Sequence, residues 1–247
     1  MILGKQLPFL RWSFIRLGLS KQLTKVWQVG DGREEDCAKY VLKNARKGDL
    51  DDVIRTIDEY AYHKKFLINV GDDKGKILDA ALERSQARRA VELGAYVGYS
   101  ALRTARKLGA GGHLYSVEFN PANADIARRL IAHAGVTDRV TVLTGSIGDG
   151  GATLTRLQEA VGAGKLDFVF IDHAKELYLS DLQKIMTAGL LHKGSVVVAD
   201  NVGFPGAPEY HAYMKEQEGK LWKTATHNTY AEYQTLIKDI VLESVLL

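Results

Sequence analysis

The sequence predicts an α/β fold: a single Rossmann-like, doubly wound sheet with helices on both faces. Short β-branched apolar segments alternate with longer amphipathic segments, which is the pattern of βαβ units. Glycines and prolines mark the boundaries between these segments. The 247 residues also suffice for one α/β domain whose core needs no cross-links.

The apolar segments are continuous runs, as expected for parallel strands that are buried on both faces. Residues 168–171 and 196–199 are the clearest, and an aspartate follows each of them. Because helical crossovers return the chain in the same direction, the sheet should be mostly parallel. Strands are expected near 89–94, 113–118, 139–144, 166–172 and 194–200.

The segments between the strands carry helix punctuation. Pro121 opens one of them, and Gly109 and Gly135 end two others. Helices are expected near 98–108, 121–134, 150–162, 178–188 and 207–217. Extra N-terminal helices are expected over 34–46, 50–62 and 74–85, with a connecting stretch at 64–73.

The last part of the chain departs from this alternation. Residues 221–227 and 238–246 read as two strands with only ten residues between them. That connection is too short for another helical crossover, so an antiparallel C-terminal strand pair is predicted.

Charge is unevenly distributed along the chain. Residues 1–30 carry five basic side chains and no acid, whereas residues 31–247 carry 28 basic and 30 acidic side chains. A nearly neutral body argues against a nucleic-acid groove. Cys37 is the only cysteine, which excludes an intrachain disulfide and favours a reducing, cytoplasmic compartment.

Residues 1–30 are expected to form a basic amphipathic arm in front of a domain at 31–247. Basic residues interrupt every apolar stretch, so no run approaches the length of a membrane span. The segment also lacks the centre and cleavage site of a signal peptide. Packing on protein is the preferred interpretation, and contact with an anionic membrane surface remains open.

A glycine loop follows the first predicted strand. Glu92-Leu93-Gly94-Ala95-Tyr96-Val97-Gly98 has the spacing G-x-x-x-G with an acid before it, not the G-x-G-x-x-G of dinucleotide sites. An acid there repels phosphate but tolerates a cationic amino-acid cofactor. Glu118, at the end of the next strand, suits a ribose diol. These features favour S-adenosylmethionine over NAD; a tight turn with incidental glycines is the alternative.

Two further strands end in oxygen ligands. Asp172 follows one strand, and Asp200 and Asn201 follow the next. Consecutive strands of such a sheet usually lie side by side, at the edge where ligands bind. Two carboxylates and an amide suit Mg²⁺ and leave positions for water and substrate. The alternative is that each aspartate caps the following helix.

Lys175 lies three residues after Asp172 and is the candidate general base. A neighbouring dication and partial burial would both favour its neutral form. Without the metal, a solvated surface lysine would be the preferred interpretation. His173 is given no catalytic role.

Several separated motifs together resemble catechol O-methyltransferase, a class I S-adenosylmethionine-dependent O-methyltransferase. The likeness runs from about Asp31 to near the C-terminus. The motifs are Asn69-Val70-Gly71-Asp72-Asp73-Lys74-Gly75, the Glu92–Ser100 loop, Glu118-Phe119-Asn120-Pro121, Asp172-His173-Ala174-Lys175, Ala199-Asp200-Asn201-Val202, Pro205-Gly206-Ala207-Pro208 and Tyr230-Ala231-Glu232-Tyr233.

The resemblance implies a role for each matching residue. Asp172, Asp200 and Asn201 would bind Mg²⁺, Lys175 would take the proton from the attacking hydroxyl, and Glu232 would hydrogen-bond the other hydroxyl. Glu232 comes from the family alone. The cofactor site would comprise Val70, Glu92, Gly94, Tyr96, Ser100, Glu118, Phe119, Ile147 and Asp172.

The chain departs from the family pattern around the expected substrate slot. Ala174 replaces a large aromatic, and Phe66 and Ile68 stand where Trp and Met are frequent. Ile147-Gly148 replaces a polar pair near the adenine edge. Phe66 and Pro205 are expected to wall the substrate ring, beside Lys175 and Asn201. The smaller residue at Ala174 should widen the slot.

The predicted function is therefore Mg²⁺-dependent methylation of one hydroxyl of a small-molecule catechol. The alternatives are methylation of larger vicinal-diol phenols, such as caffeoyl thioesters, and a non-catalytic cofactor-binding interaction protein. The physiological catechol and the oligomeric state stay open.

Overall fold

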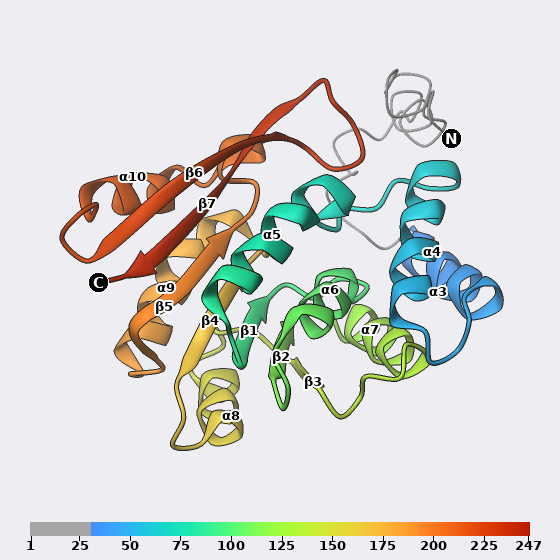
Figure 1. Cartoon of the computed structure of the whole chain (residues 1–247), viewed down its shortest axis with the longest axis horizontal. Helices are drawn as coiled ribbons and strands as arrows, with labels where there is room; N and C mark the ends of the chain where they lie inside the picture. Colours follow the sequence, from blue (N-terminus) through green and yellow to red (C-terminus); the bar gives the residue numbers. More distant parts are fainter. Residues whose placement is uncertain (1–30) are drawn as a thin grey trace.

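A computed structural model describes residues 31–247, so the predicted arm at 1–30 lies outside the described residues. The centre of the structure is a seven-stranded sheet with the order β3-β2-β1-β4-β5-β7-β6 (Figure 1). The first five strands pair in parallel, and β7 is antiparallel to both of its neighbours. The predicted Rossmann-like sheet with an antiparallel C-terminal pair is thus confirmed.

The parallel strands form close to the predicted positions because apolar residues dominate them, whereas β6 is mostly polar and forms by pairing with β7. The final pair is longer than expected, since β6 continues to Tyr230, which pairs with Lys238. The strands are β1 Arg89–Leu93, β2 His113–Glu118, β3 Val140–Thr144, β4 Leu166–Ile171, β5 Leu191–Ala199, β6 Trp222–Tyr230 and β7 Lys238–Leu246.

The helices also match the predicted order, with one notable difference at α5. This helix begins at Gly71 and not near residue 74, because Asp72 and Asp73 place favourable negative charge in its first turn. The helices are α3 Arg33–Asn44, α4 Leu50–His63, α5 Gly71–Ser85, α6 Tyr99–Lys107, α7 Pro121–His133, α8 Ala152–Val161, α9 Tyr178–Thr187 and α10 Pro208–Glu216. Two short helical turns, η3 Lys175–Leu177 and η4 Val202–Gly206, follow β4 and β5.

Helices cover both faces of the sheet, as predicted. Along β4, Phe168 and Phe170 pack into a core with side chains of α3 to α7. Val169 and Ile171 face the opposite core, which includes side chains of α8, α9 and α10. This alternation buries every second side chain of the strand on each face and fixes the strand register.

The β6–β7 pair brings its connection, residues 231–237, to the carboxyl edge of the parallel strands. β7 runs antiparallel to β5, with Ala199 opposite Leu242. The first residues of β7 therefore extend past the end of β5. In Figure 1 this connection reaches over toward α5. Residues far apart in sequence can thus meet at the strand ends.

No helix in the part of the chain that the structure describes is long and apolar enough to cross a membrane.

Candidate active site

Backbone hydrogen bonds hold the ends of β1, β4 and β5 side by side. The Asp172 amide donates to the Leu93 carbonyl at 2.9 Å, and the Asp200 amide donates to the Ile171 carbonyl at 3.0 Å. The strand order changes direction between β1 and β4. Ligands of open α/β sheets bind at such a switch point, outside the carboxyl ends of the strands.

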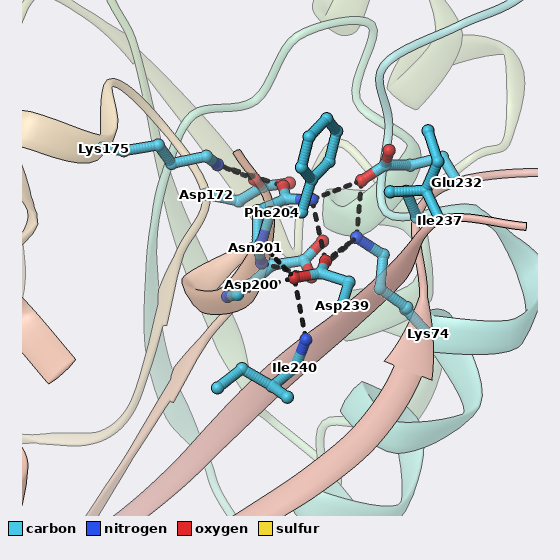
Figure 2. Close-up of polar contacts among 12 residues, drawn as sticks. Lys74, Asp172, Lys175, Asp200, Asn201, Phe204, Glu232, Ile237, Asp239 and Ile240 are labelled. Atoms are coloured by element: carbon cyan, nitrogen blue, oxygen red, sulfur yellow. Dashed lines mark hydrogen bonds and ion pairs between the residues drawn. The ribbon is translucent and has the colours of Figure 1, made fainter. Parts of the chain in front are cut away.

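The structure brings together the three predicted metal ligands, Asp172, Asp200 and Asn201, here called the metal triad. Lys175 links two of them: its Nζ lies 2.9 Å from Asp172 Oδ1 and 3.1 Å from Asn201 Oδ1 (Figure 2). The Asp200 Oδ2 atom is buried and has no hydrogen-bond partner among the described residues. The triad therefore offers oxygen donors and an unpartnered carboxylate oxygen, which fit a hard dication.

Lys175 is held in place and is not a freely solvated side chain. It opens the η3 turn, and its side chain is 19% exposed. Its Nζ also donates to the Tyr178 hydroxyl at 2.6 Å, and that hydroxyl donates to the Asp200 carbonyl at 3.0 Å. The Nζ is thus tied to both neighbouring strand ends.

The carboxylates of the metal triad carry unfavourable negative charge. Burial raises the pKa of Asp172, although Lys175 and Lys74 oppose the shift. Burial, with the charges of Asp172 and Glu232 adding to it, raises the pKa of Asp200 to about 7. Ionised carboxylates this close together are stabilised by any cation that binds between them.

Lys74 is part of this site, although the sequence analysis gave it no role. Its Nζ lies 2.8 Å from Asp200 Oδ1 and 2.5 Å from Glu232 Oε1. It also lies 3.2 Å from Asp239 Oδ2, and its side chain is only 1% exposed. Burial alone would lower the pKa of Lys74, but the three carboxylates raise it above its usual value.

A sequence signal for Lys74 exists. Lys74 precedes Leu78, Ala81 and Leu82 by four, seven and eight residues, so it lies on the apolar stripe of α5. All three of these residues are buried. A lysine within such a stripe needs a buried counter-charge.

Glu232, in the connection between β6 and β7, and Asp239, at the start of β7, orient Asn201. The Asn201 Nδ2 donates to Glu232 Oε1 at 2.7 Å and to Asp239 Oδ2 at 3.1 Å. The Asn201 Oδ1 is thereby left on the side of Lys175 (Figure 2). Burial would raise the pKa of Glu232, but Lys74 and the hydrogen bonds lower it.

Asp239 was also missed by the sequence analysis. Its Oδ1 accepts from the backbone amides of Gly203 and Phe204 at 3.1 and 2.8 Å, which fixes the η4 turn beside Asn201. Asp239 lies at the start of a strand, and nothing in its local sequence distinguishes it from a solvated aspartate. Only the pairing of β7 with β5 places it here.

Asp200, Glu232 and Asp239 form a second group of oxygens, here called the acidic cluster. One carboxylate oxygen from each lies within 4.8 Å of the others, a spacing that suits a metal ion. The Lys74 ammonium contacts all three residues. Because this cluster already holds a cation of the protein, the metal triad is the better candidate for a dication.

The predicted cofactor loop lies beside the metal triad. Gly94 adopts φ +100°, and a Cβ at this position would lie 2.3 Å from the Asp172 carbonyl oxygen. Glycine is therefore required where the loop passes the backbone of Asp172, directly after β4. Gly98 adopts φ +86° and packs against Ala127, so it lets α6 begin close to α7.

Glu92 is fully buried at the end of β1. Its Oε1 accepts from the Ser116 hydroxyl at 2.5 Å, whereas its Oε2 lacks a partner within the described part of the chain. Burial raises the pKa of Glu92 to about 7. An unpartnered carboxylate oxygen beside a glycine loop fits a cationic group of a ligand. Ser100, also buried, lies in the first turn of α6.

Glu118, at the end of β2, accepts a hydrogen bond from the glycine loop that follows β1. Its Oε2 accepts from the Tyr96 amide and its Oε1 from the Asn120 amide, both at 2.8 Å. The Phe119 side chain is 79% exposed, so it offers an apolar surface next to this carboxylate. Two of the predicted cofactor residues, Glu118 and Phe119, thus lie together at the end of β2.

The remaining predicted residues have different surroundings. The Tyr96 hydroxyl donates to Glu34 Oε1 on α3 at 2.8 Å, while Val70 and Ile147 are buried in the two cores.

The two residues predicted to wall the substrate ring lie in different segments. Pro205 is exposed in the η4 turn, and Phe66 is half-buried before α5. No described contact joins Phe66 to Pro205, so the predicted ring wall stays a prediction.

His173 has a defined environment that the sequence did not indicate. Its Nε2 lies 3.1 Å from Asp181 Oδ2, and its ring stacks on Tyr178 at a centroid distance of 5.2 Å. Its Nδ1 is buried and finds no hydrogen-bond partner in residues 31–247.

A Rossmann-like sheet with a glycine loop after its first strand and polar side chains at the adjoining strand ends is the arrangement of cofactor-binding α/β enzymes. A family model described as O-methyltransferase matches residues 46–227. The chain belongs to this O-methyltransferase family. Residues 228–247 lie beyond the match, so Glu232 and Asp239 depend on the structure for their placement.

Individual relatives agree with this assignment. A probable O-methyltransferase of Mycobacterium tuberculosis is 55% identical over 91% of this chain and 96% of its own length. Catechol O-methyltransferase of Bos taurus is 37% identical over 86% of this chain and 76% of its own length. The crystal structure of an O-methyltransferase from Bacillus cereus, solved in complex with SAH, is similar in fold, with a TM-score of 0.65, 21% identity and coverage of 93% and 97%.

Proposed function

We propose that this protein transfers the methyl group of S-adenosyl-L-methionine to one hydroxyl of a catechol with the help of Mg²⁺. The meeting of the metal triad with Lys175 and Glu232 at the ends of β4 and β5 carries this proposal. Membership of the O-methyltransferase family and the likeness to bovine catechol O-methyltransferase support it.

The oxygens of Asp172, Asp200 and Asn201 would hold the dication. When bound, Mg²⁺ would stabilise the ionised catechol hydroxyl, and S-adenosylmethionine would supply an electrophilic methyl group. The protein's own contribution is to hold the attacking oxygen in line with that methyl group at contact distance.

Lys175 would accept the proton of the attacking hydroxyl at its Nζ. A general base must lie within hydrogen-bond reach of the proton that it takes. The Nζ is fixed by Asp172 and the Tyr178 hydroxyl, yet part of the side chain is exposed to the site. Glu232, held by Asn201 and Lys74, would accept a hydrogen bond from the second hydroxyl.

The cofactor would lie along the ends of β1 and β2. Glu92 would meet the cationic amino-acid part, and the Glu118 carboxylate the ribose. Phe119 and Ile147 would flank the adenine, with Val70, Gly94, Tyr96 and Ser100 completing the site. The unpartnered Glu92 Oε2 supports this orientation, as do S-adenosylmethionine and SAH complexes among proteins of the same fold.

Ala174 is exposed beside Lys175 and offers no aromatic surface over the substrate. Larger vicinal-diol phenols are therefore the second candidate substrate class. Ala174→Trp should lower kcat/KM for a bulky diol more than for catechol itself, because the ring would fill the slot. Equal effects on both substrates would contradict a role of this position in substrate size.

The proposal is tested by methylation of a panel of catechols with S-adenosylmethionine, with Mg²⁺ present or removed by a chelator. Transfer to catechol that stops on chelation and returns with Mg²⁺ is expected. Methyl transfer at an unchanged rate in the presence of the chelator would contradict the proposed role of Mg²⁺. Cofactor binding without methylation of any vicinal diol would point to a non-catalytic binding protein.

Residues 31–247 would form the whole methyltransferase domain, and residues 1–30 an arm that contacts protein or a membrane surface. A cytoplasmic location fits the single, buried Cys37.

A further inference from the structure

The acidic cluster lies beside the metal triad and shares Asp200 with it. Its oxygens come within 4.8 Å of one another, so the cluster has the donors and the spacing of a cation site of its own. Two adjacent cation sites with one shared ligand would compete for the same dication. The Lys74 ammonium is the feature that distinguishes them.

Lys74 contacts every member of the acidic cluster with a single atom. Its Nζ lies between 2.5 and 3.2 Å from the three carboxylates. The side chain reaches this position from the first turns of α5 and is 1% exposed, so bulk water does not reach it. A point charge with three donors matches three carboxylate acceptors.

We propose that Lys74 is a positioning residue that acts as a built-in cation of the acidic cluster and thereby confines the dication to the metal triad. By holding Asp200 Oδ1, it leaves the unpartnered Oδ2 as the oxygen available to a metal. By holding Glu232 and Asp239, it also keeps these two acceptors on the Asn201 amide. The inference rests on the proposed metal-dependent function.

Charge balance supports this role. The site holds four carboxylates, those of Asp172 and the acidic cluster, and the buried Lys74 ammonium lies among three of them. When the four carboxylates are ionised, Lys74 and one dication together offset three of their charges without any contribution from Lys175. Without Lys74 the excess negative charge increases and lies on the three converging carboxylates of the acidic cluster. A second dication would bind between them.

Lys74→Met tests the proposal, because methionine keeps an unbranched side chain only one atom shorter than that of lysine and removes its charge. The number and affinity of bound Mn²⁺ ions are measured by calorimetry on the full chain without cofactor or substrate. We expect one site in the unaltered protein and a second site in Lys74→Met. We also expect kcat/KM with catechol to fall about 10- to 100-fold, as is usual when a supporting residue of a metal site is lost.

Two variants separate this role from general damage. Lys74→Arg keeps the charge and should keep a single Mn²⁺ site. Lys76→Met removes a lysine from the same helix, but Lys76 is 66% exposed and pairs only with Asp73 among the described contacts. It should change neither the stoichiometry nor the activity.

Thermal unfolding gives a second readout in case Lys74→Met folds poorly. Added Mn²⁺ should raise the unfolding temperature of Lys74→Met more than that of the unaltered protein, because the ion replaces the missing ammonium. In the double variant Lys74→Met, Glu232→Gln this additional stabilisation should disappear.

Unchanged stoichiometry and an unchanged Mn²⁺-dependent shift in Lys74→Met would overturn the proposal. Failure of the unaltered protein to bind any dication would instead contradict the proposed function. The two outcomes are distinguishable because the gain of a site in Lys74→Met does not depend on methyl transfer.

Discussion

The site has two halves that are built in opposite ways. The cofactor half is the part around the glycine loop and Glu118, and the acidic half is the acidic cluster together with Lys74 and Asn201. Most of the cofactor half comes from two consecutive strand ends and the loop of Glu92 to Gly98, within about thirty residues of sequence, although Val70, Ile147 and Asp172 lie outside that stretch. The acidic half joins α5, β5 and the β6–β7 pair, with Lys74 and Asp239 separated by 165 residues. A local site depends on backbone geometry, whereas the assembled site depends on charge balance between distant elements.

This contrast predicts that substitutions in the acidic half change chemistry and metal binding. Substitutions in the cofactor half should change cofactor affinity and loop stability.

The largest effect is expected for Lys175→Ala. Loss of a general base should lower kcat by roughly 10²- to 10⁴-fold. The dissociation constant for S-adenosylmethionine should change far less, since the printed contacts of the Lys175 Nζ are with Asp172, Tyr178 and Asn201 and not with the loop of Glu92 to Gly98. Steady-state kinetics and calorimetry measure the two quantities, with exposed Lys193→Ala as the control. Equal losses in turnover and cofactor affinity would contradict the base assignment.

Gly94→Ala should affect the cofactor half by a backbone mechanism. The added Cβ would meet the Asp172 carbonyl oxygen at 2.3 Å, at a φ of +100°. We expect a loss of about 3 kcal/mol in the free energy of unfolding, together with weaker cofactor binding. Urea unfolding measures the loss. Gly109→Ala, where the new Cβ meets open space, should be nearly neutral.

Glu92→Gln should change the pH dependence of stability. The folded-state pKa of Glu92 is about 7, above its usual value of 4.5, so its stabilising contribution is present at low pH and lost as the pH rises toward 7. Relative to the unaltered protein, the cofactor-free variant should gain stability between pH 4.5 and 7, by at most about 3 kcal/mol. Thermal unfolding from pH 4.5 to 8 measures this difference; a constant difference across the range would argue against a buried, titrating Glu92.

Tyr178→Phe should produce the smallest effect. The variant removes one hydroxyl that links Lys175 to the Asp200 backbone, and leaves the ring packed. A hydrogen bond of this kind contributes roughly 1 kcal/mol, which corresponds to about a fivefold change in kcat. Kinetics at saturating cofactor measure it. A loss as large as that of Lys175→Ala would show that the hydroxyl takes part in proton transfer.

Most of the fold was predictable because its signals are local. Runs such as Phe168 to Ile171 mark buried strands, and the short connection between 227 and 238 indicated an antiparallel pair. The boundary errors, at the start of α5 and the end of β6, arise where polar residues continue an element that pairing or the helix dipole stabilises.

The site was predictable in part for the same reason. Asp172, Asp200 and Asn201 follow apolar runs directly, so parallel pairing alone brings them together. Glu232 entered through family resemblance, and Lys74 and Asp239 were missed. Lys74 lies on the apolar stripe of α5, a signal that indicates burial but not the partner, whereas the local sequence of Asp239 resembles that of a solvated aspartate. Only the packing of α5 and β7 against the strand ends brings the two together.

The sequence by itself determined the order of elements, the glycine loop and the polar ends of neighbouring strands, because hydrophobic period and backbone conformation act over a few residues. The tertiary structure alone decided which charges face each other in the acidic cluster. Buried charges are stable only when opposite charges reach them, and that depends on how distant elements pack.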